Sequence, residues 1–142
     1  MKLIDVNVLL YAVNADSPFH AAIRPWLENA LEGGEPVGLA WVTLVGFLRV
    51  STNPRAFPRP LTEEAAMINV DQWLSHPNVR LVKESDEHWR ILQTLLKQTG
   101  TAGNLTTDAH LATLAISHGA ELVSFDADFA RFPKLRWRNP LQ

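Results

Sequence analysis

Residues 2–13 have the sequence KLIDVNVLLYAV, and this stretch decides the fold class that we predict. Its first part, residues 2–6, is a short apolar run typical of a buried strand, and the apolar spacing becomes helical from Asn7 to Val13. Asp5 lies where the strand passes into the helix. Because a buried strand followed by a helix is the building unit of parallel sheets, the stretch predicts an α/β fold.

Short apolar strands alternate with helices along the rest of the chain. Further strands are expected at residues 37–40, 79–82, 121–124 and 135–137. Helices are expected at residues 19–31, 41–50 (apolar enough to be buried), 62–74, 86–98 and 108–118, with a turn or short helix at 126–132. Asp16 is the expected cap of the first of these helices, and Thr106 or Thr107 that of the last. We therefore predict a single domain, residues 1–142, with a short central parallel β-sheet flanked by α-helices.

The composition limits the classes of protein that the chain can be. It has 142 residues, of which 46% are hydrophobic and 20% charged, a formal net charge of −2, and no cysteine. These values exclude disordered and collagen-like chains, disulfide scaffolds, thiol nucleophiles and thiolate metal sites. With no overall positive field, any contact with nucleic acid must use local basic patches or a metal ion. Asp5 interrupts the apolar start and no apolar run approaches membrane-spanning length, so we expect a cytoplasmic protein without a membrane partner.

Four aspartates lie at predicted junctions between strands and helices. Asp5 ends the first strand, Asp126 follows the strand at 121–124, Asp128 comes two residues later, and Asp108 lies in the first turn of the last predicted helix. In a parallel sheet, the carboxyl ends of strands and the starts of the following helices meet at one edge, where ligands bind. We therefore expect these carboxylates to lie close together.

Grouped carboxylates repel one another unless a cation neutralises them. An all-oxygen cluster selects Mg²⁺ or Mn²⁺, and such ions polarise phosphoryl oxygens and activate water for in-line displacement. Structural roles are equally open from the residues alone. Asp5 is also a good cap for the helix that follows it, Asp108 complements a helix dipole, and Asp126 and Asp128 are common turn residues.

Three segments carry a resemblance to a known family. The sequences LIDVNVLL (residues 3–10), TDAHLA (107–112) and SFDADF (124–129) resemble, in order, the motifs of PIN-domain nucleases. The resemblance covers nearly the whole chain and is greatest to the VapC-type toxins of bacterial toxin–antitoxin pairs. The segments FLRV (47–50), TNPRAF (52–57) and LRWRNPL (135–141) are similar to one subgroup of these toxins.

This resemblance implies a PIN-like fold and an endoribonuclease that depends on Mg²⁺ or Mn²⁺ and cleaves RNA of the translation machinery, of the tRNA or rRNA class. Asp5, Asp108 and Asp126 match the metal-site acids of the family, Asp128 matches an auxiliary acid, and Asn7 matches the polar residue after the first acid. The resemblance also implies a homodimer and a VapB-like antitoxin. We expect a groove for this antitoxin beside residues 18–31 and 41–50.

The chain departs from the family pattern at Gly46, where many members have a glutamate. Fewer carboxylates weaken metal binding or leave more water on the ion. Thr43 and Arg49 lie three residues to either side, on the same helix face. Thr43 is a candidate for holding a metal-bound water, or is a buried hydroxyl bonded to the backbone. Arg49 is a candidate for binding the scissile phosphate or for pairing with Asp5 or another acid.

Other residues have weaker functional signals. Basic side chains that could contact phosphates form two groups: Arg49, Arg55 and Arg59, and Lys134, Arg136 and Arg138. His110 follows Asp108 by two residues and so points to a different side of the helix, while His88 is expected to pack a helix.

Two other functions compete with the nuclease. Gly46 is compatible with a non-catalytic PIN-like module that binds RNA or protein without cutting. The early aspartate Asp5 is also compatible with a phosphatase similar to haloacid dehalogenases, but those enzymes carry a second aspartate where this chain has Asn7.

Overall fold

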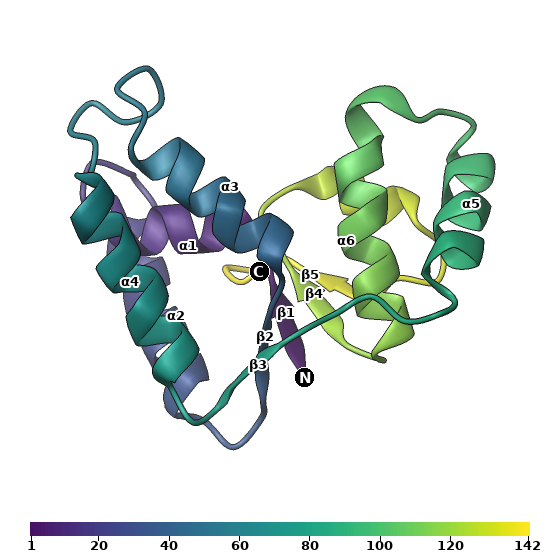
Figure 1. The fold of residues 1–142 in the computed structure, drawn as a ribbon, viewed down its shortest axis with the longest axis horizontal. Helices are drawn as coiled ribbons and strands as arrows, with labels where there is room; N and C mark the ends of the chain where they lie inside the picture. Colours follow the sequence, from purple (N-terminus) through teal and green to yellow (C-terminus); the bar gives the residue numbers. More distant parts are fainter.

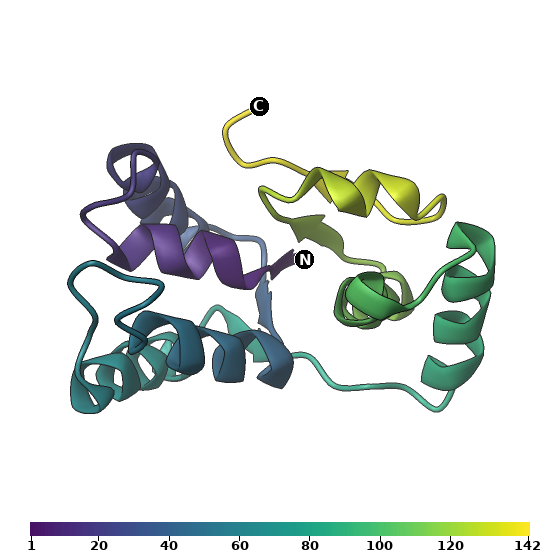
Figure 2. The ribbon, with the colours of Figure 1, turned by 90° about the horizontal axis from the view of Figure 1, so that it is seen from above.

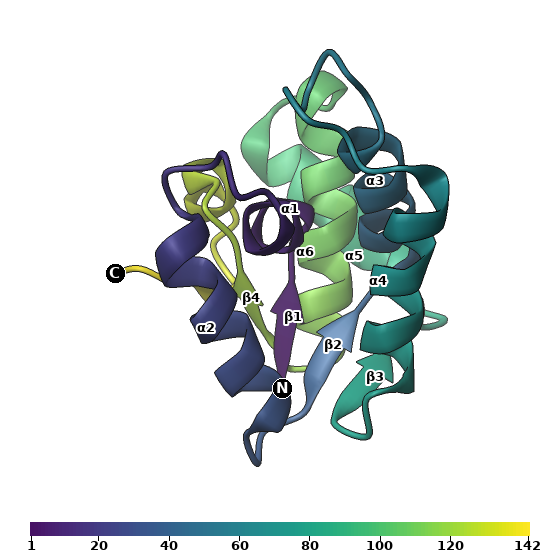
Figure 3. The ribbon, with the colours of Figure 1, turned by 90° about the vertical axis from the view of Figure 1, so that its left-hand side faces the viewer.

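The computed structural model of the protein describes residues 1–142 and contains one five-stranded sheet. Its strands are β1 (Lys2–Ile4), β2 (Val37–Leu39), β3 (Val79–Leu81), β4 (Glu121–Val123) and β5 (Trp137–Arg138). The strand order is β3-β2-β1-β4-β5, and all four pairings are parallel. β1 therefore lies between β2 and β4, as Figure 3 shows. The predicted α/β fold with a short parallel sheet is confirmed.

Helices cover both faces of this sheet. They are α1 (Val6–Val13), α2 (His20–Glu32), α3 (Trp41–Ser51), α4 (Glu63–Ser75), α5 (His88–Thr99) and α6 (Thr106–Ser117), with the short 3-10 helices η1 (Gly103–Leu105) and η2 (Ala127–Arg131). Helices α1 to α4 lie on one side of the sheet, and α5, α6 and η2 lie on the other (Figures 1 and 2). No helix has both the length and the apolar composition that crossing a membrane requires.

The core is divided by the sheet into two halves. Ile4 packs in the half formed with α1 to α4, whereas its neighbour Leu3 packs in the half formed with α5, α6 and η2. Successive side chains of a strand point to opposite faces, so a strand covered on both sides must be apolar throughout. This explains why β1 is a continuous apolar run rather than an alternating one.

Several predicted helix ends differ from the structure. Helix α2 begins at His20 rather than Phe19 and has no side-chain cap. Asp16, the expected cap, instead forms an ion pair with Arg59 (Oδ1 to Nη2, 2.6 Å). Thr106 and Thr107 do not cap α6 but lie inside its first turn, since the 3-10 turn η1 leads directly into the helix.

Helix α3 is not buried as predicted. One face packs against α1 and α4, but Trp41 is 53% exposed and Val45 is 58% exposed on the other face. Part of the apolar surface of α3 is therefore left exposed.

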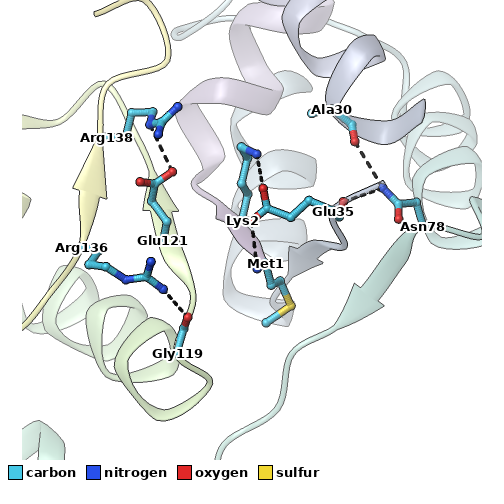
Figure 4. Close-up of polar contacts among 9 residues, drawn as sticks. All are labelled: Met1, Lys2, Ala30, Glu35, Asn78, Gly119, Glu121, Arg136 and Arg138. Atoms are coloured by element: carbon cyan, nitrogen blue, oxygen red, sulfur yellow. Dashed lines mark hydrogen bonds and ion pairs between the residues drawn. The ribbon is translucent and has the colours of Figure 1, made fainter. Parts of the chain in front are cut away.

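Polar contacts join the segments that enter the sheet (Figure 4). Glu35 pairs with the Met1 amine (3.0 Å) and with Lys2, which together lower the pKa of its carboxyl to about 2. Arg138 pairs with Glu121 (3.1 Å), and Arg136 donates to the Gly119 carbonyl. Arg136 and Arg138, two of the basic residues predicted as possible phosphate contacts, are therefore engaged within the chain.

Replacing Gly38 by Ala is expected to destabilise the fold by about 1–3 kcal/mol, the usual effect of overpacking a core. Gly38 lies in the centre of β2, and a Cβ there would be 2.8 Å from Val82 Cγ2 and 3.3 Å from Leu3 Cδ1. Urea unfolding measures the change. Gly34→Ala is the matched control, because nothing lies within 4 Å of a Cβ at that position. Equal stability of the two variants would contradict the packing described for β2.

Candidate active site

A pocket at the carboxyl edge of the sheet contains most of the predicted site residues. It is lined by Asp5, Val6, Asn7, Val42, Thr43, Thr107, Asp108, Leu111 and Asp126. The end of β1, the start of α3, the first turn of α6 and the segment after β4 supply these residues. The parallel register explains why residues far apart in sequence meet here, since β1 lies beside β4 from Lys2 opposite Glu121 to Ile4 opposite Val123.

Three carboxylates form the closest group in this site. One oxygen from each of Asp108, Asp126 and Asp128 lies within 4.8 Å of the others. The turn after β4 brings Asp128 in, because the Asp128 backbone N–H donates to Asp126 Oδ1 (2.9 Å). Asp128, predicted as an auxiliary acid, is therefore part of the group, whereas Asp5 is not.

Asp5 lies deeper, and only 9% of it is exposed. Its Oδ1 accepts from the Val6 backbone N–H (2.7 Å), which caps α1, and its Oδ2 accepts from the Ser124 hydroxyl (2.6 Å). Burial raises the pKa of Asp5, and these two hydrogen bonds oppose that rise. The residue thus has the structural capping role and also lines the pocket.

Ser124 is the residue whose role the sequence did not indicate. It is fully buried, and its hydroxyl donates to Asp5 while accepting from Asn7 Nδ2 (3.1 Å) and from the Asp126 backbone N–H (3.0 Å). Asn7 Oδ1 in turn accepts from the Phe125 backbone N–H (3.3 Å). The sequence does place the Ser124 hydroxyl at the end of an apolar strand. Because a buried hydroxyl needs hydrogen-bond partners, this position could have indicated that Ser124 contacts the site.

The three candidate residues on α3, Thr43, Gly46 and Arg49, differ in burial and in contacts. Thr43 is 2% exposed and its Oγ1 has no hydrogen-bond partner, so the predicted bond to backbone is wrong. Arg49 is exposed and forms no ion pair, so its predicted pairing with Asp5 or another acid is also wrong. At Gly46 a Cβ would make an ordinary contact with Val6 Cγ2 (3.5 Å), so packing does not require glycine there.

The electrostatics of the site favour a bound cation. Burial, followed by repulsion from Asp126, Asp5 and Asp128, raises the pKa of Asp108 to about 6. The carboxylates thus oppose each other's ionisation, a cost that an opposite charge removes. All donors are oxygens, and the unpartnered Thr43 hydroxyl lines the same pocket. This donor set fits a hard divalent cation.

A separate apolar groove lies between α1, α2 and α4. Its lining consists of Ala12, Val13, Arg24, Leu27, Glu28, Leu31, Leu61, Asn69, Gln72, Trp73 and His76. This groove lies beside residues 18–31, where the antitoxin groove was expected, whereas residues 41–50 do not line it. Helix α4 takes that place: it packs against α3, with the Trp73 ring against Phe47, and it forms one wall of the groove.

The fold and the site define a class of protein, namely an α/β protein with an acidic pocket at the carboxyl edge of a parallel sheet. The family model described as PIN domain matches residues 2–135, so the chain belongs to the PIN domain family.

Known proteins resemble the chain over almost its whole length. Ribonuclease VapC37 of Mycobacterium tuberculosis is 49% identical over 140 residues, which cover 99% of this chain and 97% of the relative. Ribonuclease VapC33 of the same organism is 42% identical over 142 residues, covering 100% and 99%. The crystal structure of VapBC2 from Rickettsia felis bound to a DNA fragment from their promoter has a TM-score of 0.70 at 21% identity, covering 97% of each chain. The predicted resemblance to VapC-type PIN domains is confirmed.

Proposed function

We propose that the chain is a single PIN domain spanning residues 1–142 and acts as a VapC-type toxin, an endoribonuclease that hydrolyses RNA phosphodiester bonds with Mg²⁺ or Mn²⁺. The observation that carries the proposal is the gathering of Asp108, Asp126 and Asp128 within 4.8 Å beside Asp5. Relatives that share 42–49% of its residues and are named ribonucleases support it. By analogy with the family, the RNA belongs to the tRNA or rRNA class and the protein acts in the cytoplasm.

We assign Asp108, Asp126 and Asp128 as the residues that hold the ion, and Asp5 as a further carboxylate that lines the pocket beside Asp108 and Asp126. When bound, such an ion polarises a phosphoryl oxygen and lowers the pKa of water. Ser124 orients Asp5 by its 2.6 Å hydrogen bond. The Thr43 hydroxyl, which has no partner, can hold a water in the pocket.

Two further residues have supporting roles in this proposal. Asn7 joins the ends of β1 and β4 through its contacts with Ser124 and Phe125, so that Asp5 and Asp126 keep a fixed separation. The exposed, unpaired Arg49 is free to bind a phosphate of the RNA.

Metal-dependent cleavage tests the proposal. Freshly purified, antitoxin-free protein and its Asp126→Asn variant are incubated with a mixture of tRNA and rRNA while Mg²⁺ or Mn²⁺ is titrated. We expect cleavage that needs the ion and is lost in the variant. Cleavage that survives both EDTA and Asp126→Asn would overturn the assigned site. Absence of both cleavage and metal binding would favour a non-catalytic binding module.

Gly46→Glu is expected to tighten Mn²⁺ binding about tenfold, which corresponds to about 1.4 kcal/mol. The new side chain would extend from α3 beside Val6, which lines the pocket, and would add a negative charge near the ion. Isothermal titration calorimetry measures the affinity. Gly46→Gln has the same shape without the charge and is the control. Equal affinities of the Glu and Gln variants would contradict an electrostatic effect.

We propose the groove between α1, α2 and α4 as the binding site of a VapB-like antitoxin. Leu27, Leu31 and Trp73 offer apolar surface there, with Arg24 and Glu28 beside them for polar contacts. Leu31→Glu is expected to weaken binding of the antitoxin without changing RNA cleavage. Unchanged antitoxin affinity in this variant would place the contact elsewhere.

We also propose that the chain forms a homodimer through the exposed apolar face of α3. Trp41 and Val45 lie one helical turn apart, and each is more than half exposed. Large exposed apolar groups of this kind mark interaction surfaces. Val45→Asp is expected to convert the dimer to a monomer in light scattering, and an unchanged mass would exclude this face.

A further inference from the structure

A pair of histidines joins α5 to α6 outside the acidic pocket. Nε2 of His88 lies 2.9 Å from Nδ1 of His110, and the two rings meet edge to face with their centroids 4.8 Å apart. His110 does not line the acidic pocket, although Asp108 lies only two residues before it on the same helix. The two ring nitrogens belong to different helices and point at each other.

A carboxylate lies behind this pair. Oε1 of Glu84, in the connection between β3 and α5, is 3.6 Å from Nε2 of His110, the nitrogen that does not face His88. Histidines that bind metals commonly donate their second N–H to a carboxylate, which fixes the tautomer and leaves the first nitrogen as the ligand. Glu84 lies on this side of His110, where a small movement of its side chain would let it accept from Nε2–H and so direct the lone pair of Nδ1 toward His88.

His88 has no other polar anchor. Its Nδ1 is buried without a hydrogen-bond partner, so Nε2 is the only ring atom with a polar contact. Burial and the neighbouring His110 lower the pKa of His88. The neutral imidazole that a metal ion requires is therefore favoured near neutral pH.

The connection before His88 is acidic, and α5 is held to the rest of the chain mainly through α6. Glu84 and Asp86 lie in the connection that precedes His88, and the neighbouring Glu87 pairs with Arg90. Leu95 is the one buried residue of α5, the N-terminus of the helix has no side-chain cap, and Figure 2 shows the helix at the outer edge of its side of the sheet. A bond between His88 and His110 would hold this helix to α6.

We propose that His88 Nε2 and His110 Nδ1 form a binding site for a borderline transition-metal ion such as Zn²⁺, which links α5 to α6 and is distinct from the carboxylate site. Imidazole suits Zn²⁺, whereas the all-oxygen pocket suits Mg²⁺ or Mn²⁺. Two Zn–N bonds of about 2.0–2.1 Å in tetrahedral geometry separate the nitrogens by about 3.3 Å. The observed 2.9 Å therefore needs to widen only slightly, which rotation of either ring provides.

Zinc binding to tag-free protein tests this site, in an Asp126→Asn background that weakens the carboxylate site. Calorimetry and thermal unfolding are measured with ZnCl₂ for the background chain and for the added substitutions His88→Gln and His110→Gln. We expect one Zn²⁺ per chain, a rise in Tm, and binding at least about tenfold weaker in each histidine variant. Mg²⁺ should produce no such rise in Tm.

Two further variants serve as controls. His118→Gln alters a histidine of the same region that contacts only the Lys83 carbonyl (2.7 Å), and it should bind Zn²⁺ as the background does. His110→Cys restores a zinc ligand in a chain without other cysteines, and it should recover binding if the glutamine variant loses it through misfolding. Equal Zn²⁺ affinity in the background and in both histidine-to-glutamine variants, or no Zn²⁺ binding in the background, would overturn the proposal.

Discussion

Asp108→Asn is expected to reduce RNA cleavage by about 10²–10³-fold, the range typical of losing one charge-stabilising group, and at the same time to stabilise the metal-free chain at neutral pH. Both effects have one cause. The carboxyl of Asp108 is held near three others, which together with burial raise its pKa to about 6. The ionised Asp108 carboxylate is needed to hold the cation, but without the cation the same negative charge destabilises the folded chain.

The sign of the stability effect follows from this pKa. The pKa rises from 3.8 to about 6 on folding, so stability from this group is fully present below about pH 3.8 and is lost as the pH rises through about 6. Asparagine resembles the protonated carboxyl and avoids this loss. Because the side chain is partly exposed to solvent, solvent screening reduces the gain to about 1 kcal/mol.

Denaturant unfolding in EDTA at about pH 5 and about pH 8 measures this effect. Asp108→Asn should exceed the wild type in free energy of unfolding at the higher pH and approach it at the lower. Added Mn²⁺ should stabilise the wild type and leave the variant unchanged. Asp71→Asn, an exposed substitution on α4, is the control. A variant that is less stable than the wild type at the higher pH would contradict the repulsion described for the site.

The edge of the sheet where the acids meet was predictable from the sequence. The apolar run before Asp5 and the one before Asp126 could be recognised as strands, and parallel strands bring their carboxyl ends to one edge. The helix start that carries Asp108 was found in the same way. This information is local, since each junction is contained in a few consecutive residues.

The remaining features depend on contacts between distant segments. Asp16 does not cap α2, and its carboxylate instead binds Arg59, 43 residues later. Ser124 acquires its role only when β4 lies beside β1 and its hydroxyl meets Asp5, 119 residues away. The inclusion of Asp128 depends on the turn that follows β4. Sequence patterns show the spacing of residues but not which distant side chains bind each other. The positions of the acids at the edge of the sheet were therefore predictable, whereas the hydrogen bonds that orient them were not.

Ser124→Ala is expected to lower the free energy of unfolding by about 1–3 kcal/mol, because it leaves buried groups without hydrogen-bond partners. The substitution removes the donor to Asp5, and it also removes the acceptor of the Asn7 amide and of the Asp126 backbone N–H. Urea unfolding measures the loss. Ser51→Ala is the matched control, because Ser51 is equally buried but its hydroxyl has no partner, so its removal should cost little.

The same substitution should change the pH dependence of cleavage, which a purely structural role would not do. The Ser124 hydrogen bond lowers the pKa of Asp5, against the burial that raises it. Without this bond the pKa of Asp5 rises further, so its ionised form appears only at higher pH. If the ionised form is the active one, the acid limb of the rate profile moves to higher pH. Cleavage below the midpoint of the limb is therefore expected to fall. A profile that superimposes on that of Ser51→Ala would show that Ser124 supports the fold but does not position Asp5 for the reaction.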